Sequence, residues 1–91
     1  MPYSPYFLTG EQIRAARAFL RMEQADLARQ ARVSLETIKR LERMRGPVEA
    51  TTRTVAAIST AFSACGVIFD LGEGQGPGLR LRDASGPQRG I

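Results

Sequence analysis

Apolar residues recur at intervals of three and four along most of the chain, as they do on the buried side of an α-helix. The spacing predicts four helices, over residues 10–22, 24–31, 35–43 and 52–65. Elements with one apolar side must pack against each other, so the sequence predicts a mostly α-helical domain. In chain order, the predicted buried positions are Ile13, Ala16 and Leu20; Leu27, Ala28 and Ala31; Ile38 and Leu41; and Val55, Ile58, Ala61, Phe62 and Cys65.

Residues that cap helices mark the starts of these segments. Thr9 followed three residues later by Gln12 has the form of a capping box, which predicts that the first helix begins directly after it. Ser34 is a good N-cap for the third helix, and Thr51 or Thr52 for the fourth. The caps therefore support the helix boundaries independently of the apolar spacing.

Glycine and proline mark the ends of the later helices. Gly46-Pro47 is expected to stop the third helix, because proline cannot continue a helical hydrogen-bond pattern. Gly66 fits the left-handed position that commonly follows the end of a helix. The second and third helices are separated only by the short break at residues 32–34.

After Gly66 the pattern becomes strand-like. Residues 67–71, VIFDL, are rich in β-branched and aromatic side chains, and residues 79–82, LRLR, alternate strictly. Residues 72–78, GEGQGPG, have glycine at every second position and are expected to form a loose loop between two strands of a hairpin. A phosphate-binding loop is disfavoured here, because the GK[ST] ending and a following helix are both missing.

The chain is thus expected to contain four segments. Residues 1–8 read as an extended aromatic arm, and residues 83–91 as a polar tail without fixed structure. Between them lie the helical domain, residues 9–66, and the β segment, residues 67–82. A two-stranded hairpin is marginal alone, so this segment is expected either to cover the helical core or to pair with another chain.

The composition excludes several classes of function. The chain has no histidine and one cysteine, Cys65, which removes the commonest general base, the usual catalytic triads and any intrachain disulfide. Cys65 is expected to be a small core residue, and Asp70, Glu73 and Asp83 lack metal-ligand spacing. We therefore expect neither an enzyme nor a bound metal or cofactor. With no membrane-spanning run and no export signal, a cytoplasmic protein is expected.

Positive charge is concentrated in one window. The net charge is +4 with a pI of about 10.2, and residues 29–45 carry six cations against Glu36 and Glu42, which also gives +4. A basic patch on one element of a small domain is typical of nucleic-acid binding, although a solvated helix face has the same composition. The six cations are Arg29, Arg32, Lys39, Arg40, Arg43 and Arg45.

Two short helices joined by a turn of three residues, with the second helix basic, form a helix-turn-helix arrangement. The pieces are QADLARQA (24–31), RVS (32–34) and LETIKRLER (35–43). Ala28 is small where the helices must approach closely, and Val33 can fill the space under the turn. Ile38 and Leu41 would anchor the second helix, and its outward side would then fit a DNA major groove. The outward residues are Glu36, Lys39, Arg40 and Arg43.

Residues 11–66 resemble the Cro/repressor-type, or Xre-like, helix-turn-helix family, and residues 67–82 resemble the ending of many small bacterial members. The resemblance implies a lambda-repressor-like fold of four helices, followed by a short C-terminal β-hairpin or strand. It also implies double-stranded DNA as the partner and a bacterial or phage-encoded protein located at the nucleoid. The residues that carry it are Arg17, Gln24, Leu27, Ala28, Val33-Ser34, Ile38, Leu41-Glu42 and the apolar pattern of the fourth helix.

The resemblance implies roles for individual residues. Gln24 would contact the DNA backbone, where a helix N-terminus also favours phosphate. Arg40 could read guanine bidentately, Glu36 could accept from cytosine, and Leu35 and Thr37 could touch thymine methyl groups. Basic side chains at the remaining positions would hold phosphates and fix the register. The expected DNA-contacting set is Gln24, Arg32, Ser34, Leu35, Glu36, Thr37, Lys39, Arg40, Arg43 and Arg45.

Two further residues, Arg17 and Glu42, carry opposite charges inside the apolar arcs of their helices. Half-buried charges need partners, and the family places an ion pair at these positions, so we expect a structural Arg17–Glu42 bridge. Arg32 departs from the family, which usually has glycine just before the Val-Ser pair. A left-handed backbone there costs a non-glycine residue roughly 1 kcal/mol.

These observations favour a transcriptional regulator that binds operator DNA as a homodimer, with residues 35–43 in the major groove. Repression by occluding a promoter is the simplest mechanism, and activation through polymerase contact stays open. One alternative is an antitoxin or phage-derived regulator of the same fold, which also binds a partner protein. Another is a protein-interaction module without DNA binding.

Overall fold

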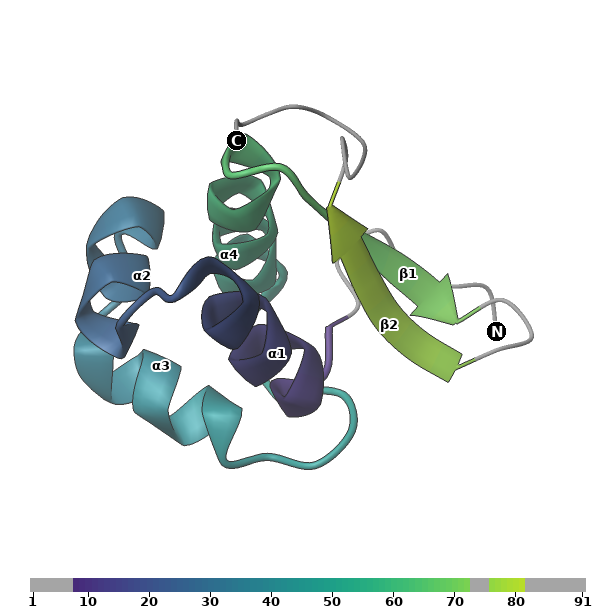
Figure 1. The fold of residues 1–91 in the computed structure, drawn as a ribbon. Helices are drawn as coiled ribbons and strands as arrows, with labels where there is room; N and C mark the ends of the chain where they lie inside the picture. Colours follow the sequence, from purple (N-terminus) through teal and green to yellow (C-terminus); the bar gives the residue numbers. More distant parts are fainter. Residues whose placement is uncertain (1–7, 73–75, 82–91) are drawn as a thin grey trace.

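The computed structural model describes residues 8–72 and 76–81, and this part of the chain consists of helices followed by a hairpin (Figure 1). It confirms the predicted mostly α-helical fold with a C-terminal β-hairpin. The predicted arm, apart from Leu8, and the predicted tail lie outside the described residues. The helices are α1 Gly10–Leu20, α2 Gln24–Ala31, α3 Leu35–Glu42 and α4 Thr52–Ala64, and the strands are β1 Val67–Gly72 and β2 Gly76–Leu81.

The predicted caps are present at the starts of three helices. Thr9 Oγ1 accepts from the Gln12 N–H at 3.0 Å, and Gln12 Oε1 accepts from the Thr9 N–H at 2.9 Å, which completes the capping box of α1. The Ser34 hydroxyl accepts from the N–H of Thr37 at the start of α3. Thr51, rather than Thr52, caps α4 in the same way. Each cap satisfies an N–H group that has no partner within its own helix.

The first helix ends earlier than the sequence predicted. Its apolar pattern continues to Met22, but α1 stops at Leu20 because Arg21 adopts a left-handed backbone with φ of 55°. The N–H of Met22 donates to the Arg17 carbonyl at 2.9 Å, which closes the turn. Arginine at this position gives no sign in the sequence of the conformation that glycine ordinarily marks.

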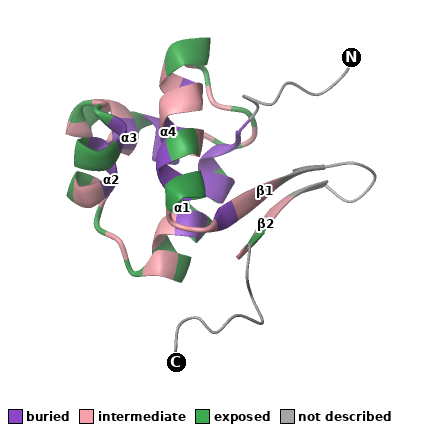
Figure 2. Ribbon diagram, turned by 90° about the horizontal axis from the view of Figure 1, so that it is seen from above, coloured by how far each residue is buried: buried purple, intermediate pink, exposed green. Residues whose placement is uncertain are grey.

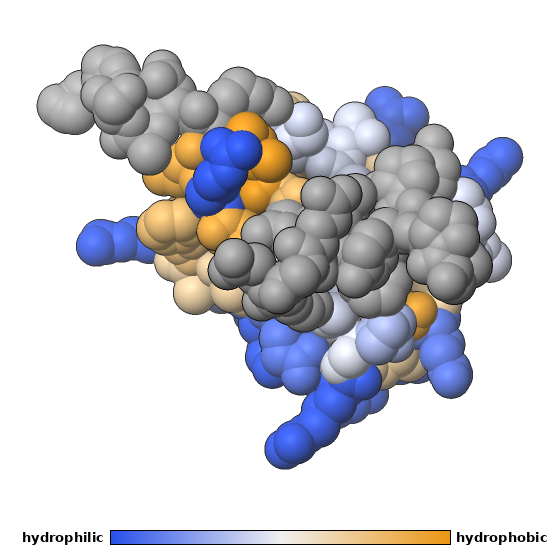
Figure 3. Space-filling view, turned by 90° about the vertical axis from the view of Figure 1, so that its right-hand side faces the viewer, coloured by the Kyte–Doolittle hydropathy of each residue, from blue (hydrophilic) through white to orange (hydrophobic). Residues whose placement is uncertain are grey.

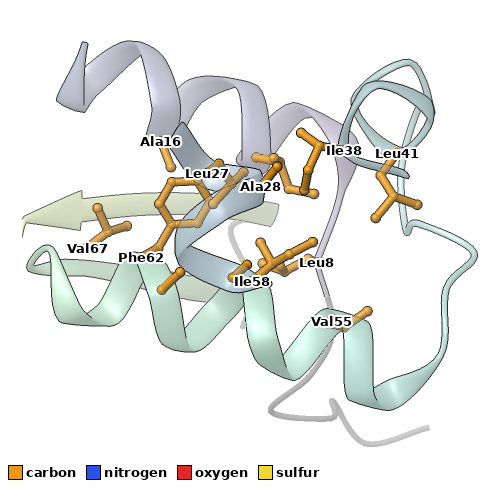
Figure 4. Close-up of a cluster of buried hydrophobic side chains, with 13 residues drawn as sticks. Leu8, Ala16, Leu27, Ala28, Ile38, Leu41, Val55, Ile58, Phe62 and Val67 are labelled. Carbon is orange, nitrogen blue, oxygen red and sulfur yellow. The ribbon is translucent and has the colours of Figure 1, made fainter. Parts of the chain in front are cut away.

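The core lies where the four helices meet. Leu27, Ile38, Leu41, Ile58 and Phe62 are fully buried, and they come from α2, α3 and α4 (Figure 4). Residues of intermediate and full exposure lie along the same helices, between the buried ones (Figure 2). Because each helix contributes one apolar side, no helix can be removed without exposing the others.

Cys65 differs from its predicted place in this core. It is only partly buried, at the C-cap of α4, and its thiol donates to Gln30 Oε1 at 3.7 Å. The prediction treated Cys65 as one more helical position after Phe62. The helix has already ended at Ala64, so the side chain leaves the buried side.

The hairpin covers one side of the helical core. β1 and β2 pair antiparallel from Val67 opposite Leu81 to Gly72 opposite Gly76. Val67 is buried, and the ring of Phe69 packs edge-on against Phe62 with centroids 5.6 Å apart. The hairpin is therefore part of the folded domain.

The loop predicted for residues 72–78 is shorter than expected. Strand pairing continues through Gly72 and resumes at Gly76, so both strands extend into the glycine-rich stretch. Backbone groups form a ladder whatever the side chain, whereas alternation of side chains cannot be read through glycines. Gly78 also accepts a hydrogen bond from the Gln12 side chain at 2.9 Å, which ties β2 to α1.

Candidate nucleic-acid interface

The turn between α2 and α3 brings the two helices together over three residues. Arg32 adopts a left-handed backbone with φ of 58°, and the N–H of Val33 donates to the Ala28 carbonyl at 3.0 Å. Val33 packs against the core, and Ala28 is buried where the helices approach. The turn therefore has the left-handed geometry that glycine adopts most easily, with arginine at this position.

The third helix is held by its buried side and is exposed on the other. Ile38 and Leu41 have no exposed surface, whereas Glu36, Arg40 and Arg43 are exposed. This separation follows from helical spacing, because residues three apart lie on the same side. The outward side of α3 thus presents a carboxylate and two guanidinium groups, as the sequence predicted.

The other expected contact residues of this region vary in exposure. Ser34, Arg32 and Arg45 are exposed, and Thr37 and Lys39 are half-buried. The Ser34 hydroxyl is engaged in capping α3 and also donates to Thr37 Oγ1. These two side chains therefore already have partners at the N-terminus of α3.

Leu35 is also half-buried, at the start of α3, and it packs against the core. Its side chain consequently offers only part of its surface to a DNA groove. The expectation of a thymine contact concerns that exposed part alone.

Glu42 is the charged residue on the inner side of α3. Its side chain is 4% exposed. The carboxylate accepts two hydrogen bonds from the Arg17 guanidinium, with Nε 2.5 Å from Oε2 and Nη2 2.7 Å from Oε1. The hydrogen bond to Glu42 raises the pKa of the Arg17 guanidinium against the opposing effect of burial. The predicted structural ion pair is confirmed, in the bidentate geometry that makes such pairs strong.

The same carboxylate joins three helices. Arg17 of α1 also donates to the Met22 carbonyl at 2.8 Å, and Gln24 of α2 donates to Glu42 Oε1 at 3.1 Å. From α1, Arg14 donates to the backbone carbonyl of Glu42 at the end of α3. These bonds define the Glu42 cluster, consisting of Arg14, Arg17, Gln24 and Glu42, which fixes the orientation of α3 against α1 and α2.

The Gln24 side chain therefore points toward Glu42 and not simply to solvent. Its amide NH₂ donates to Glu42, while its backbone N–H lies in the first turn of α2, whose start is capped by Glu23 and Asp26. Sequence reasoning missed this inward bond, because it depends on how α2 packs against α3.

Tertiary packing determines where the guanidinium groups of Arg40 and Arg53 lie. Arg40 Nη1 lies 3.4 Å from the Glu49 carbonyl, so the guanidinium leans toward the segment that follows α3. Arg53, in the first turn of α4, borders with Arg32 a groove of about 640 Å³ between α2 and α4. Sequence reasoning did not single out Arg53, and nothing in the sequence placed this cation on the same groove as Arg32.

Arg29 contributes less to the basic side than its charge suggested. It pairs with Asp26 three residues earlier in α2. The pKa of Asp26 is lowered, first by a hydrogen bond from the backbone of Glu23 and then by Arg29. An exposed pair of this kind is close to neutral as a unit, so the positive field comes from the other cations.

The described residues offer little for other kinds of site. They contain no group of three or more His, Cys, Asp or Glu side chains arranged to hold a metal ion. None of their helices has both the length and the apolar character needed to cross a membrane. Comparisons with protein-family models and with curated proteins found no match for this sequence.

Proposed function

We propose that the protein is a sequence-specific DNA-binding transcriptional regulator, which acts as a homodimer with α3 in the major groove. The observation that carries the proposal is the division of α3 into two sides. Ile38 and Leu41 are fully buried, Glu36, Arg40 and Arg43 are exposed, and a B-DNA major groove accepts a helix presented in this way.

The Glu42 cluster supports the proposal because base reading needs a helix in a fixed orientation. Arg17 and Gln24 converge on one carboxylate, and Arg14 bonds the end of α3. In this proposal Arg40 reads a base edge, and Arg43, Arg45 and Arg32 neutralise phosphates. Bound at a promoter, such a dimer would repress by excluding polymerase.

The test is a titration of the full chain against DNA selected from a random pool, repeated at several salt concentrations. Affinity is expected to fall steeply with salt, because neutralised phosphates release counterions. Arg40→Ala should weaken the selected site by about 1–3 kcal/mol and relax the preference at one base position. Arg43→Ala should lower the salt slope by about one while leaving the preferred sequence unchanged.

Arg21→Ala is the matched control, because Arg21 is exposed and lies outside the proposed contact set. It should leave the selected sequence unchanged. Absence of binding, or binding that does not respond to salt, would contradict the proposed function and favour a module that contacts only proteins.

A further inference from the structure

The groove between α2 and α4 is bordered by two guanidinium groups that come from different helices. Arg32 is the C-cap of α2, and Arg53 lies in the first turn of α4. Both side chains are exposed, and both line the groove. Neither guanidinium forms a hydrogen bond or ion pair with another of the described residues. Both positive charges are therefore available to a ligand.

The other polar side chains of the groove suit the same kind of ligand. Among the described residues, the lining contains Gln30 and Thr60 as further polar residues and no carboxylate, and the rest are alanines. The Cys65 thiol donates to Gln30 Oε1 at 3.7 Å, which leaves the Gln30 amide NH₂ as a donor. The Thr60 hydroxyl can donate as well. A ligand that carries negative charge and accepts hydrogen bonds is thus the chemical class that fits.

The position of Arg32 connects this groove to the helix proposed to read DNA. Arg32 stands two residues before Ser34, the N-cap of α3. A helix that lies in a major groove has a sugar-phosphate backbone on each side, because the groove is about 12 Å wide. A cation beside the start of α3 therefore lies close to one strand. The strand that Arg32 contacts then continues along the α2–α4 groove, on which Arg53 also lies.

The surface on the other side of α4 has a different character. Figure 1 shows α2 and the hairpin on opposite sides of α4. The hairpin side carries a patch of apolar atoms (Figure 3). Such a patch offers no donor to a phosphate group, whereas the α2–α4 groove offers hydrogen-bond donors and two positive charges. Charge complementarity thus favours this groove as the path of a phosphate backbone.

We infer that the α2–α4 groove holds neighbouring phosphates of one DNA strand, with Arg32 and Arg53 neutralising one each. The inference rests on the proposed function, because it takes α3 to lie in the major groove, and it adds Arg53 to the contacts of Arg32. An acidic protein segment carries the same charge, but a DNA strand beside α3 is brought to Arg32 by the same complex. Phosphate contacts of this kind fix the position of a protein on the duplex without specifying the sequence.

The first experiment measures the affinity of the full chain for its selected duplex over a range of salt concentrations. Arg53→Gln should lower the salt slope by about one and leave the preferred sequence unchanged. Arg53→Lys keeps the charge and should keep most of the slope. Arg80→Gln removes an exposed arginine from β2, and as the matched control it should leave the slope close to that of the wild type. Circular dichroism should show that each variant keeps its helices.

The second experiment locates the phosphates by ethylation interference, in which single phosphates of the duplex are ethylated and thereby lose their charge. Ethylation of two neighbouring phosphates on one strand should weaken binding of the wild-type chain. Arg53→Gln should become insensitive to ethylation at one of them, and Arg32→Gln at the other. Interference that is the same for the wild type and Arg53→Gln would contradict the assigned contact.

The outcomes separate this inference from the proposed function. A chain that binds its selected duplex with a salt slope that Arg53→Gln leaves unchanged would overturn the inference and leave the proposed function intact. A chain that binds duplexes of every sequence equally, with a slope that still depends on Arg53, would support the inference and contradict sequence-specific binding. Poly-glutamate is the further probe. Binding of this peptide that depends on Arg53, with no effect of Arg53 on the DNA slope, would assign the groove to an acidic protein and overturn the inference.

Discussion

At the scale of single residues, Glu42 shows why a charge can lie inside this small core. A carboxylate with 4% exposure has lost most of its hydration, and Arg17 and Gln24 replace it. Arg17→Met should therefore destabilise the protein by about 3–5 kcal/mol, because it leaves a buried charge without its main partner. Urea unfolding followed by circular dichroism would measure this change.

The double variant Arg17→Met with Glu42→Leu measures how strongly the two side chains depend on each other. Its loss of unfolding free energy should be clearly smaller than the sum of the losses for the single changes, since no buried charge is then left unpaired. Strictly additive costs would show that the two side chains act independently. Asp26→Asn, which breaks the exposed Asp26–Arg29 pair, is the control and should have a much smaller effect.

Glu11 provides a residue-scale prediction about pH. Its pKa is lowered from the usual 4.5, first by the hydrogen bond from the Gly46 N–H, then by its own backbone N–H and, against the opposing effect of burial, by Arg14 and Arg45. A lowered pKa means that the carboxylate stabilises the fold above its usual pKa, and that this contribution is lost as pH falls through the folded-state value. Glu11→Gln should thus lower Tm at pH 7, and the difference from wild type should vanish in strong acid.

Thermal unfolding of both proteins between pH 2 and 7, at one low protein concentration, would measure this difference. Glu36→Gln removes a charge from an exposed position on α3 and serves as the comparison. A difference that stayed constant across the pH range would show that the Glu11 carboxylate does not carry the effect.

At the scale of elements, the sequence predicted what depends on local chemistry. Thr9 with Gln12 and Ser34 begin helices because their side chains bond nearby N–H groups, and such bonds span only three residues. The predicted end of α1 was wrong, because Arg21 takes a left-handed conformation that an arginine does not reveal in the sequence. The predicted start of β2 was wrong, because glycines hide the alternation of side chains that marks a strand.

The residues of the candidate site divide in the same way, into those that the sequence reveals and those that depend on how the helices pack. Arg17 and Glu42 could be paired from the sequence, since both charges break an apolar arc and the family resemblance joins them. The inward bond of Gln24 and the position of Arg53 on the same groove as Arg32 could not be predicted, because both depend on the angles at which α2, α3 and α4 pack. Those angles follow from the whole core, which no single segment encodes.

The left-handed turn between α2 and α3 allows a prediction that separates stability from binding. Arg32→Gly should stabilise the fold by up to about 1 kcal/mol, because glycine adopts positive φ without strain. If Arg32 neutralises a phosphate, the same change should lower the salt slope of DNA binding by about one. Arg21→Gly has the same backbone change with φ of 55°, and should stabilise without altering the slope. Denaturant unfolding and salt titrations would measure both, and equal slopes for the two variants would exclude the Arg32 contact.

At the scale of the whole molecule, the proposed dimer predicts how DNA must be arranged. Two copies of α3 related by a twofold axis read two half-sites that face the same side of the duplex. Inserting five base pairs between the half-sites rotates one of them to the opposite side, so the dimer can engage only one at a time. Affinity should then fall by about 100-fold or more, because the second contact no longer benefits from being tethered.

Fluorescence anisotropy on the selected site, with inserts of five and ten base pairs, would measure this dependence. The insert of ten base pairs returns both half-sites to the same side of the duplex, and it should recover part of the affinity if the dimer can span the longer distance. A wild-type chain that bound every spacing equally well would show that it reads DNA one copy at a time.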